Sequence, residues 1–391
     1  MVGLPTSSTD GTVGSPVQAA RDLVPALAKA SLEIEELRRL PDGIVKLLRD
    51  AGMFHIAFPH YAGGGDYDPV TAARIVEELA TGDASAAWCV MLAAQMGGFV
   101  GFFPEDEAKL MFGNGQIAAS SARPIGRAVA KDGGYTVSGR WPFASGSSHA
   151  DWFGAECIVY DGDDTRKDAG GNEVTRMLMV PRADVVLHDT WFTTGLRGTA
   201  SNDFSVESTF VPHTRGVQML VDPPLVDRPI HRAMPLVFIN HASHSIGIAR
   251  ASIRVATELI RTKRGWGDRP LRENARLQAS LAESIIAVES ARSHLYTKSA
   301  ELWQEAVDGR DDNAALRSHV RLGASHGARA SLHAVDVLHG ILGTSSIFAG
   351  SSLERHFRDI RTASTHVMIG QMTIEAAGRV ELGMEPDMPF F

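Results

Sequence analysis

The sequence contains only two cysteines and fewer basic than acidic residues, and both shortages narrow the class of protein. Cys89 and Cys157 each lie in an apolar run, so the 391 residues hold neither a disulfide framework nor a cysteine-based zinc site. The net charge of −8 excludes the dense basic surface that non-specific nucleic-acid binding needs. With 44% apolar and 21% charged residues, the composition predicts a globular protein, and a reducing cytoplasm suits it best.

Targeting and membrane signals are also scarce. Residues 1–16 lack a basic segment followed by an apolar one, so we expect a disordered lead rather than a signal peptide. Residues 84–103 carry no charge and are long enough to cross a bilayer. Their flanks are acidic and they include glycines and Gln95, so we predict a helix buried on all sides and no membrane association.

The hydrophobic pattern changes twice along the chain. Apolar residues follow helical spacing up to about residue 112, and short β-branched runs separated by turns occupy residues 116–212. Helical patterns return at residues 236–262, 272–307, 314–340 and 361–382. We therefore predict an α+β protein with an N-terminal helical domain (17–115), a β-domain (116–225) and a C-terminal helical bundle (226–391).

Several catalytic motifs are missing. The chain has no Walker A sequence, no strand-bounded G-x-G-x-x-G and no G-x-S-x-G elbow. Ten of its 15 histidines follow residue 230, but no glutamate has a histidine three residues later, so we expect no metal. His319, His326 and His333 recur every seven residues, which predicts a packed or interface stripe on one helix face.

Residues 139–152 form the richest polar and aromatic cluster. Aromatic rings beside small hydroxyl residues at a strand end can offer a flat ligand both a stacking wall and a hydrogen bond. The same residues also suit an edge strand that enters a serine-rich loop. Composition and order leave both interpretations open.

Four segments in order resemble the acyl-CoA dehydrogenase superfamily. They are residues 40–79, 139–152, 195–212 and 353–359, the last ending in the pair Arg358-Asp359. The resemblance implies an N-terminal helical domain, a central β-barrel or sandwich domain, and a C-terminal four-helix bundle. It also implies a homotetramer built as a dimer of dimers.

The departures from that family indicate a different chemistry. The position of the family's catalytic glutamate is held by Val367, with His366 immediately before it, and Gly343-Thr344-Ser345-Ser346 replaces the family's double-glycine stretch. The combination of Trp141-x-Phe143-x-Ser145-Gly146 with His366 instead resembles the branch of two-component flavin-dependent monooxygenases. The resemblance implies reduced FAD or FMN from a separate NAD(P)H:flavin reductase, O₂ as co-substrate, and hydroxylation of a small aromatic such as an indole or a phenol through a C4a-hydroperoxyflavin.

The resemblance also implies roles for individual residues. His366 is expected to accept or orient a substrate proton, and Ser145 to meet the flavin N5; Phe143 would lie near the ring face. The remaining expected flavin contacts are Ser120, Ser121 and Trp141, with Arg261, Lys263 and Arg264 at the phosphates across a subunit interface. The expected substrate wall comprises Trp88, Met91, Gln95 and Met96 together with His366.

Two alternatives stay open at this point. An acyl-CoA dehydrogenase with a displaced base would need another carboxylate in the bundle, and Glu258 is the candidate. A non-catalytic scaffold that kept the fold would bind no reduced flavin.

Overall fold

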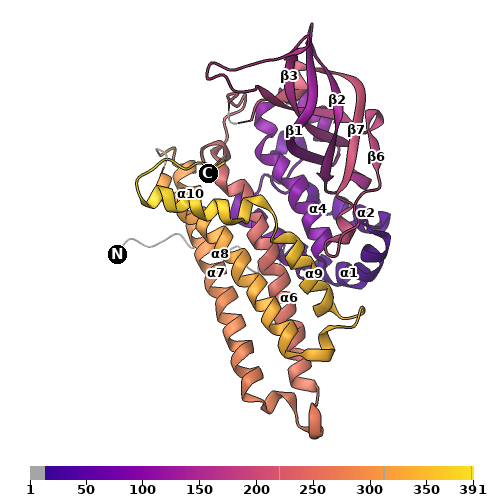
Figure 1. Ribbon diagram of the computed structural model, residues 1–391, viewed down its shortest axis with the longest axis vertical. Coiled ribbons are helices and arrows are strands. Elements are labelled where there is room, and N and C mark those ends of the chain that lie inside the picture. The colour runs from indigo at the N-terminus through magenta and orange to yellow at the C-terminus, as the bar shows by residue number, and fades with distance from the viewer. Residues whose placement is uncertain (1–13, 220, 311–312, 389) are drawn as a thin grey trace.

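The computed structural model describes residues 14–219, 221–310, 313–388 and 390–391. Helices at the N-terminal side pack beneath a β-sheet, and a long helical body extends away from both (Figure 1). The predicted order of helices, sheet and helices is confirmed. Most of the predicted lead, residues 1–13, lies outside the described residues, and the first helix begins at Pro16.

Three of the five N-terminal helices begin at side chains that accept backbone N–H groups. Ser15 accepts from Gln18, Asp68 from Val70 and Thr71, and Asp83 from Ala86, as N-caps do. The helices are α1 (Pro16–Leu37), α2 (Asp42–Asp50), α3 (Pro69–Ala80), α4 (Ala84–Gln95) and α5 (Glu105–Phe112).

α4 continues into two 3₁₀ turns, and the combined segment Ala84–Phe102 has the length and apolarity of a membrane span. Among the described residues no other segment does, and 83% of this one is buried within the protein. As predicted, it is a core helix, since its apolar surface is already covered by the protein.

The strands form one mixed sheet in the order β6-β7-β2-β1-β3-β5-β8, with β4 paired to β3. The central β-domain implied by the family resemblance is present, and hydrogen bonding joins its eight strands in a single sheet whose outer strands are β6 and β8. β1 and β3 run parallel and the other pairs are antiparallel. The bounds are β1 (Ala118–Lys131), β2 (Gly134–Ala144), β3 (Trp152–Asp161), β4 (Asp164–Thr165), β5 (Thr175–Pro181), β6 (Val186–His188), β7 (Asn202–Pro212) and β8 (Gly216–Val217).

The C-terminal body consists of the long helices α6 (Asn240–Thr262), α7 (Ala275–Val307) and α8 (Ala314–Ile341), with the shorter α9 (Ser352–Ala363) and α10 (Gln371–Glu381) packed on α8. The continuous helix predicted over residues 361–382 is wrong. The chain leaves helical geometry between Ala363 and Gln371, where His366 caps a 3₁₀ turn and Gly370 is extended.

Two buried contacts fix how these parts meet. Glu77 of α3 is fully buried and bonds to Arg250 of α6 and to Arg292 and Tyr296 of α7. Asp359 of α9 accepts the backbone N–H of Leu196 at 2.6 Å. A side chain at Gly195 would stand 2.1 Å from the carbonyl oxygen of Arg358, so only glycine allows this approach. Two of the family-like segments therefore dock on each other.

Candidate active site

A cavity of about 520 Å³ lies where the sheet, α4 and the turn between α9 and α10 meet. We call it the main cavity. It is lined by Leu92, Gln95, Met96, Phe99, Ser120, Ser121, Ala122, Arg123, Phe143, Met177, Val217, Met219, Phe238, Thr365, His366, Val367, Met368 and Phe390. Its walls are mainly apolar with a few polar groups, which is the usual character of a small-molecule site.

The sheet side of the main cavity carries two unbonded hydroxyls. Ser120 and Ser121 lie on β1 just before its register with β3 shifts, and neither hydroxyl bonds to another residue within the described ranges. Arg123 follows at the exposed rim. The two hydroxyls can form hydrogen bonds with a ring that contains heteroatoms, and the exposed guanidinium of Arg123 can bind a phosphate.

Phe143 projects into the main cavity because of its backbone. Its φ is 65°, a left-handed conformation that a non-glycine residue rarely adopts, and its side chain is 57% exposed. Trp141, two residues earlier on β2, stays in the core instead: it is 0% exposed, donates Nε1–H to the carbonyl of Glu156 at 2.7 Å and stacks on Phe204. In this structure Trp141 belongs to the core of the sheet domain, and its contact with a flavin stays a prediction.

His366 faces the main cavity from the break between α9 and α10. Its Nδ1 accepts the backbone N–H of Met368 at 3.3 Å, so the proton of the neutral ring resides on Nε2. Burial, and next to it the charge of Arg321, lower the pKa of His366 to about 4. At neutral pH the site thus presents an uncharged imidazole with an N–H donor.

Three histidines surround Trp88 of α4. The ring centroids of His241, His244 and His366 lie 5.6, 5.1 and 5.7 Å from that of the indole, each nearly perpendicular to it. His241 also stacks on His366 at 4.1 Å. This arrangement fixes the His366 ring from one side by aromatic contacts.

Ser145 lies behind the cavity wall. Its hydroxyl accepts Nε1–H of Trp88 at 3.1 Å and bonds to Ser201 at 2.7 Å, which in turn bonds to Thr199. The residue is buried and is not part of the lining. In this structure Ser145 positions Trp88, and its contact with a flavin N5 stays a prediction.

Only part of the predicted substrate wall lines the main cavity. Gln95 and Met96 line the main cavity. Trp88 does not line it but contacts the ring of His366, which does. Met91 is 0% exposed and lies in the protein core. Met91 is absent from the lining of the main cavity, and its contact with a substrate stays a prediction.

The predicted phosphate cluster is far from this cavity. Arg261 lies in the last turn of α6, which begins beside α4 at Asn240, and the 21 positions that separate the two residues span roughly 32 Å of helix. Lys263 bonds to Ser345, and Arg264 pairs with Asp268. Within one chain these cations do not meet the main cavity, so any role at a flavin phosphate requires a second copy.

The main cavity contains no aspartate or glutamate among the described residues. Glu258, the alternative base, is exposed on α6 and is absent from that lining. Removal of an α-proton from a thioester needs a carboxylate at the reacting carbon, so the dehydrogenase alternative has no base here.

Sequence reasoning missed several lining residues, chiefly Phe238, Met219 and Phe390. They come from segments without a local motif, and the tertiary fold alone brings them to the cavity. The contact of His241 with His366 also has no local signal, because it depends on the break between α9 and α10.

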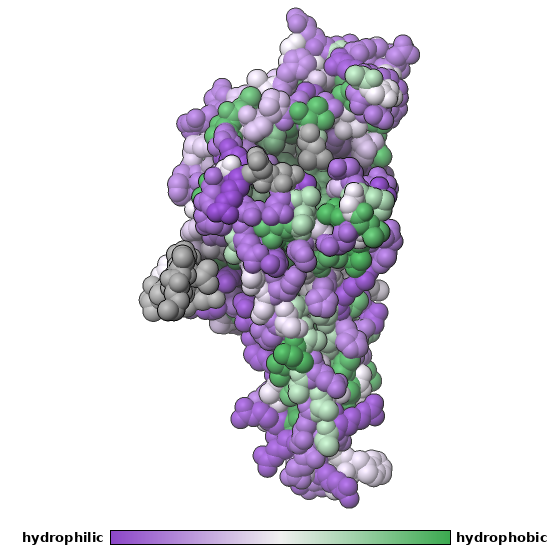
Figure 2. All heavy atoms as spheres, turned by 90° about the vertical axis from the view of Figure 1, so that its left-hand side faces the viewer, coloured by the Kyte–Doolittle hydropathy of each residue, from purple (hydrophilic) through white to green (hydrophobic). Residues whose placement is uncertain are grey.

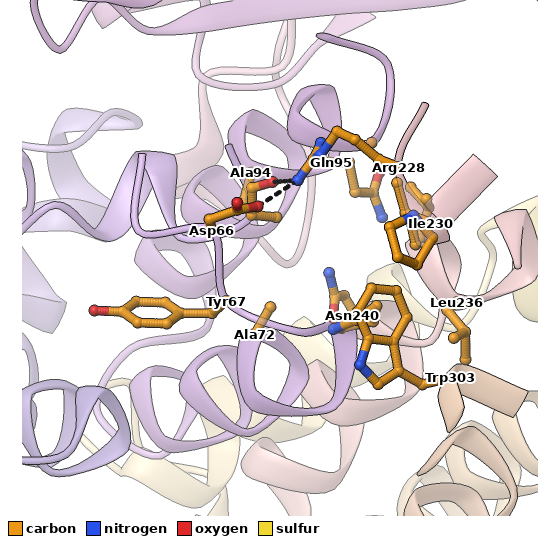
Figure 3. Close-up of a pocket in the computed structure, with 15 residues that line it drawn as sticks. Asp66, Tyr67, Ala72, Ala94, Gln95, Arg228, Ile230, Leu236, Asn240 and Trp303 are labelled. Carbon is orange, nitrogen blue, oxygen red and sulfur yellow. Dashed lines mark hydrogen bonds and ion pairs between the residues drawn. The ribbon is translucent and has the colours of Figure 1, made fainter. Parts of the chain in front are cut away.

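A second cavity of about 280 Å³ adjoins the first, and Gln95 lines both. In Figure 3 Asn240 and Trp303 face its interior while Arg228 bonds to Asp66 at one end. Gln95 also contacts Nδ1 of His241 at 3.3 Å. Gln95 therefore connects the lining of both cavities to the histidine cluster.

The main cavity fits a flavin ring by its donor set. It supplies the two free hydroxyls of β1, the projecting phenyl ring of Phe143 and an open cation at the rim, and it offers no buried carboxylate that would repel a reduced, anionic ring.

Comparisons with known proteins agree with this arrangement. Residues 17–110 match the family model "Acyl-CoA dehydrogenase, N-terminal domain", and residues 239–371 match "Acyl-CoA dehydrogenase, C-terminal domain". The chain belongs to the acyl-CoA dehydrogenase superfamily.

Individual relatives lie within one branch of that superfamily. Indole-3-acetate monooxygenase of Acinetobacter baumannii is 25% identical over 359 residues, with 90% of each chain covered. The oxygenase component of FADH₂-dependent resorcinol hydroxylase from a Rhizobium species is 28% identical over 381 residues, again with 90% of each chain covered. XiaF from Streptomyces, solved with FADH₂ and glycerol, shares the fold with a TM-score of 0.87 at 24% identity and 96% coverage of both chains.

Proposed function

We propose that this protein is the oxygenase component of a two-component flavin-dependent monooxygenase that hydroxylates a small aromatic substrate. The observation that carries the proposal is the main cavity itself: an apolar chamber with two free hydroxyls, a neutral histidine donor and no carboxylate. The relatives named above are oxygenases of this kind, which supports the same conclusion.

Residues on one wall of the main cavity bind the flavin, and His366 on the opposite wall orients the substrate. A bound reduced flavin supplies the activation of O₂. Ser120 and Ser121 are the hydrogen-bond partners proposed for the ring, and Phe143 covers its face. The apolar lining excludes water from the reacting atoms, which favours oxygen transfer over release of hydrogen peroxide.

His366 faces the substrate from the opposite wall. As a neutral imidazole it donates Nε2–H to a phenolic oxygen and orients the aromatic ring. Accepting the substrate proton instead requires the Nδ1–H tautomer, which gives up the hydrogen bond from Met368. We therefore assign His366 the orienting role first, with substrates of the phenol or indole type.

The partners follow from the same proposal. A separate NAD(P)H:flavin reductase supplies reduced FAD or FMN. A homotetramer is supported by exposed apolar side chains on the helical body, among them Ile286, Phe348 and Trp266, the last 100% exposed. Figure 2 shows apolar patches along this narrow part of the molecule. The two cysteines are free and buried, in keeping with a cytoplasmic location.

Anaerobic titration with reduced FAD and reduced FMN tests the proposal. We expect saturable binding and, on mixing with oxygen, a slow transient in the near-ultraviolet absorbance. Ser121→Leu should abolish binding by filling the ring site, whereas Ser208→Leu on exposed β7 should not. Tightly held oxidised FAD that an acyl-CoA bleaches would replace the proposal with the dehydrogenase alternative.

A further inference from the structure

Arg321 of α8 is a fully buried cation without a counter-ion. The residue is 0% exposed, and its hydrogen bonds to other described residues run from Nη2 to Thr373 Oγ1 at 3.3 Å and to Met388 Sδ at 3.9 Å. Nε and Nη1 have no partner, and no carboxylate pairs with the guanidinium in the part of the chain that the structure describes. By contrast, Arg250 and Arg292 share the buried carboxylate of Glu77. An uncompensated charge in such a position is costly.

The guanidinium lies one side chain behind the wall of the main cavity. Its central carbon is 5.9 Å from the ring centroid of Phe238, which lines the cavity. Thr373, its hydrogen-bond partner, donates to the carbonyl of Met368, another lining residue. The charge of Arg321 also contributes, after burial, to the lowered pKa of His366.

On the basis of the proposed function, we propose that Arg321 anchors a carboxylate of the substrate, so that the substrate is an aromatic acid. The carboxylate enters between Phe238 and Met368 and supplies the acceptor that Nε and Nη1 lack, while the aromatic ring stays beside His366. A guanidinium is suited to this task because it remains charged when buried and presents several N–H donors.

The proposal makes an unusual demand on stability. If Arg321 served the fold, its removal would destabilise the protein. If Arg321 instead binds a ligand, its unpaired buried charge destabilises the ligand-free protein. Arg321→Met should then leave the melting temperature of the ligand-free protein unchanged or raise it.

Binding to matched pairs of probes tests the substrate class. Protein holding reduced flavin under anaerobic conditions is titrated with indole-3-acetate, phenylacetate and benzoate, and with the amide of each. We expect at least one acid to bind about 10–100-fold more tightly than its amide, the range of a charge-assisted hydrogen bond. Arg321→Met should abolish that preference without changing the affinity for the amide, and Arg321→Lys should restore part of it.

Arg329→Met is the matched control, because Arg329 lies on the same helix but is exposed and bonds to Gln371. If every amide binds as well as its acid, or if Arg321→Met keeps the preference, the proposal is overturned. If Arg321→Met fails to fold, the claim that the buried charge destabilises the free protein is overturned. The binding of acid and amide probes to the wild-type protein then still decides the substrate class. Failure of the proposed function is separate, since it appears as loss of reduced-flavin binding before any probe is added.

Discussion

Replacing His366 by alanine should separate oxygen transfer from flavin binding. The imidazole is neutral at pH 7, because its pKa of about 4 leaves it protonated in roughly one molecule in a thousand. It offers Nε2, while Nδ1 is occupied by Met368. Loss of a positioned proton-transfer or hydrogen-bonding group lowers the rate about 10²–10⁴-fold. We expect the rate of product formation in His366→Ala to fall by at least about 10²-fold.

The assay measures product and hydrogen peroxide from the same amount of reduced flavin. Product should fall and peroxide rise, while the dissociation constant for reduced flavin changes less than about twofold, a small part of any site's binding energy. Val367→Ala is the control, because it lines the same cavity without a polar group. Unchanged coupling in His366→Ala, or equal uncoupling in Val367→Ala, would refute the role of the imidazole.

Two further predictions concern stability. Glu77→Gln should destabilise the protein by about 3–5 kcal/mol, because two half-buried arginines lose their shared carboxylate. The control Asp50→Asn removes one partner of an exposed ion pair and should cost under about 1 kcal/mol. Thermal melting compares the two variants. Burial lowers the pKa of His356 to about 3, so the unfolded chain binds more protons than the folded one between pH 6.5 and pH 3. The contribution of His356 to the free energy of unfolding is therefore highest above pH 6.5 and decreases as the pH falls. In His356→Asn the slope of the free energy of unfolding against pH should be smaller by the equivalent of about one bound proton. Parallel slopes for the two proteins would contradict the prediction.

The hydrophobic periodicity was sufficient to predict most of the fold. Helical spacing predicted a helix over residues 70–79, and the structure has α3 at Pro69–Ala80. Short β-branched runs predicted strands within residues 116–212, and β1 to β7 lie between Ala118 and Pro212. The parallel pairing of β1 with β3 could not be predicted from these runs, because it is determined by contacts between segments more than 30 residues apart.

Alternation along β2 explains why one aromatic of the predicted cluster misses the cavity. Trp141 and Phe143 are two residues apart and would share a face of a regular strand. The left-handed conformation at Phe143 and the register shift between Trp141 and Ala144 break that regularity. Phe143 therefore turns outward while Trp141 remains in the core. The motif identified the correct segment, but backbone geometry decided which ring is available to a ligand.

The break between α9 and α10 shows the same limit at His366. Apolar spacing across residues 361–382 favours one continuous helix, and in such a helix the imidazole would be one more side chain on its surface. Instead, the side chain of His366 replaces a backbone acceptor for Met368, and extended Gly370 starts a new helix. Histidine is an uncommon cap, so local propensity gives no warning. Local sequence and final structure disagree at the residue proposed to handle the substrate, as is expected where function rather than stability selects the conformation.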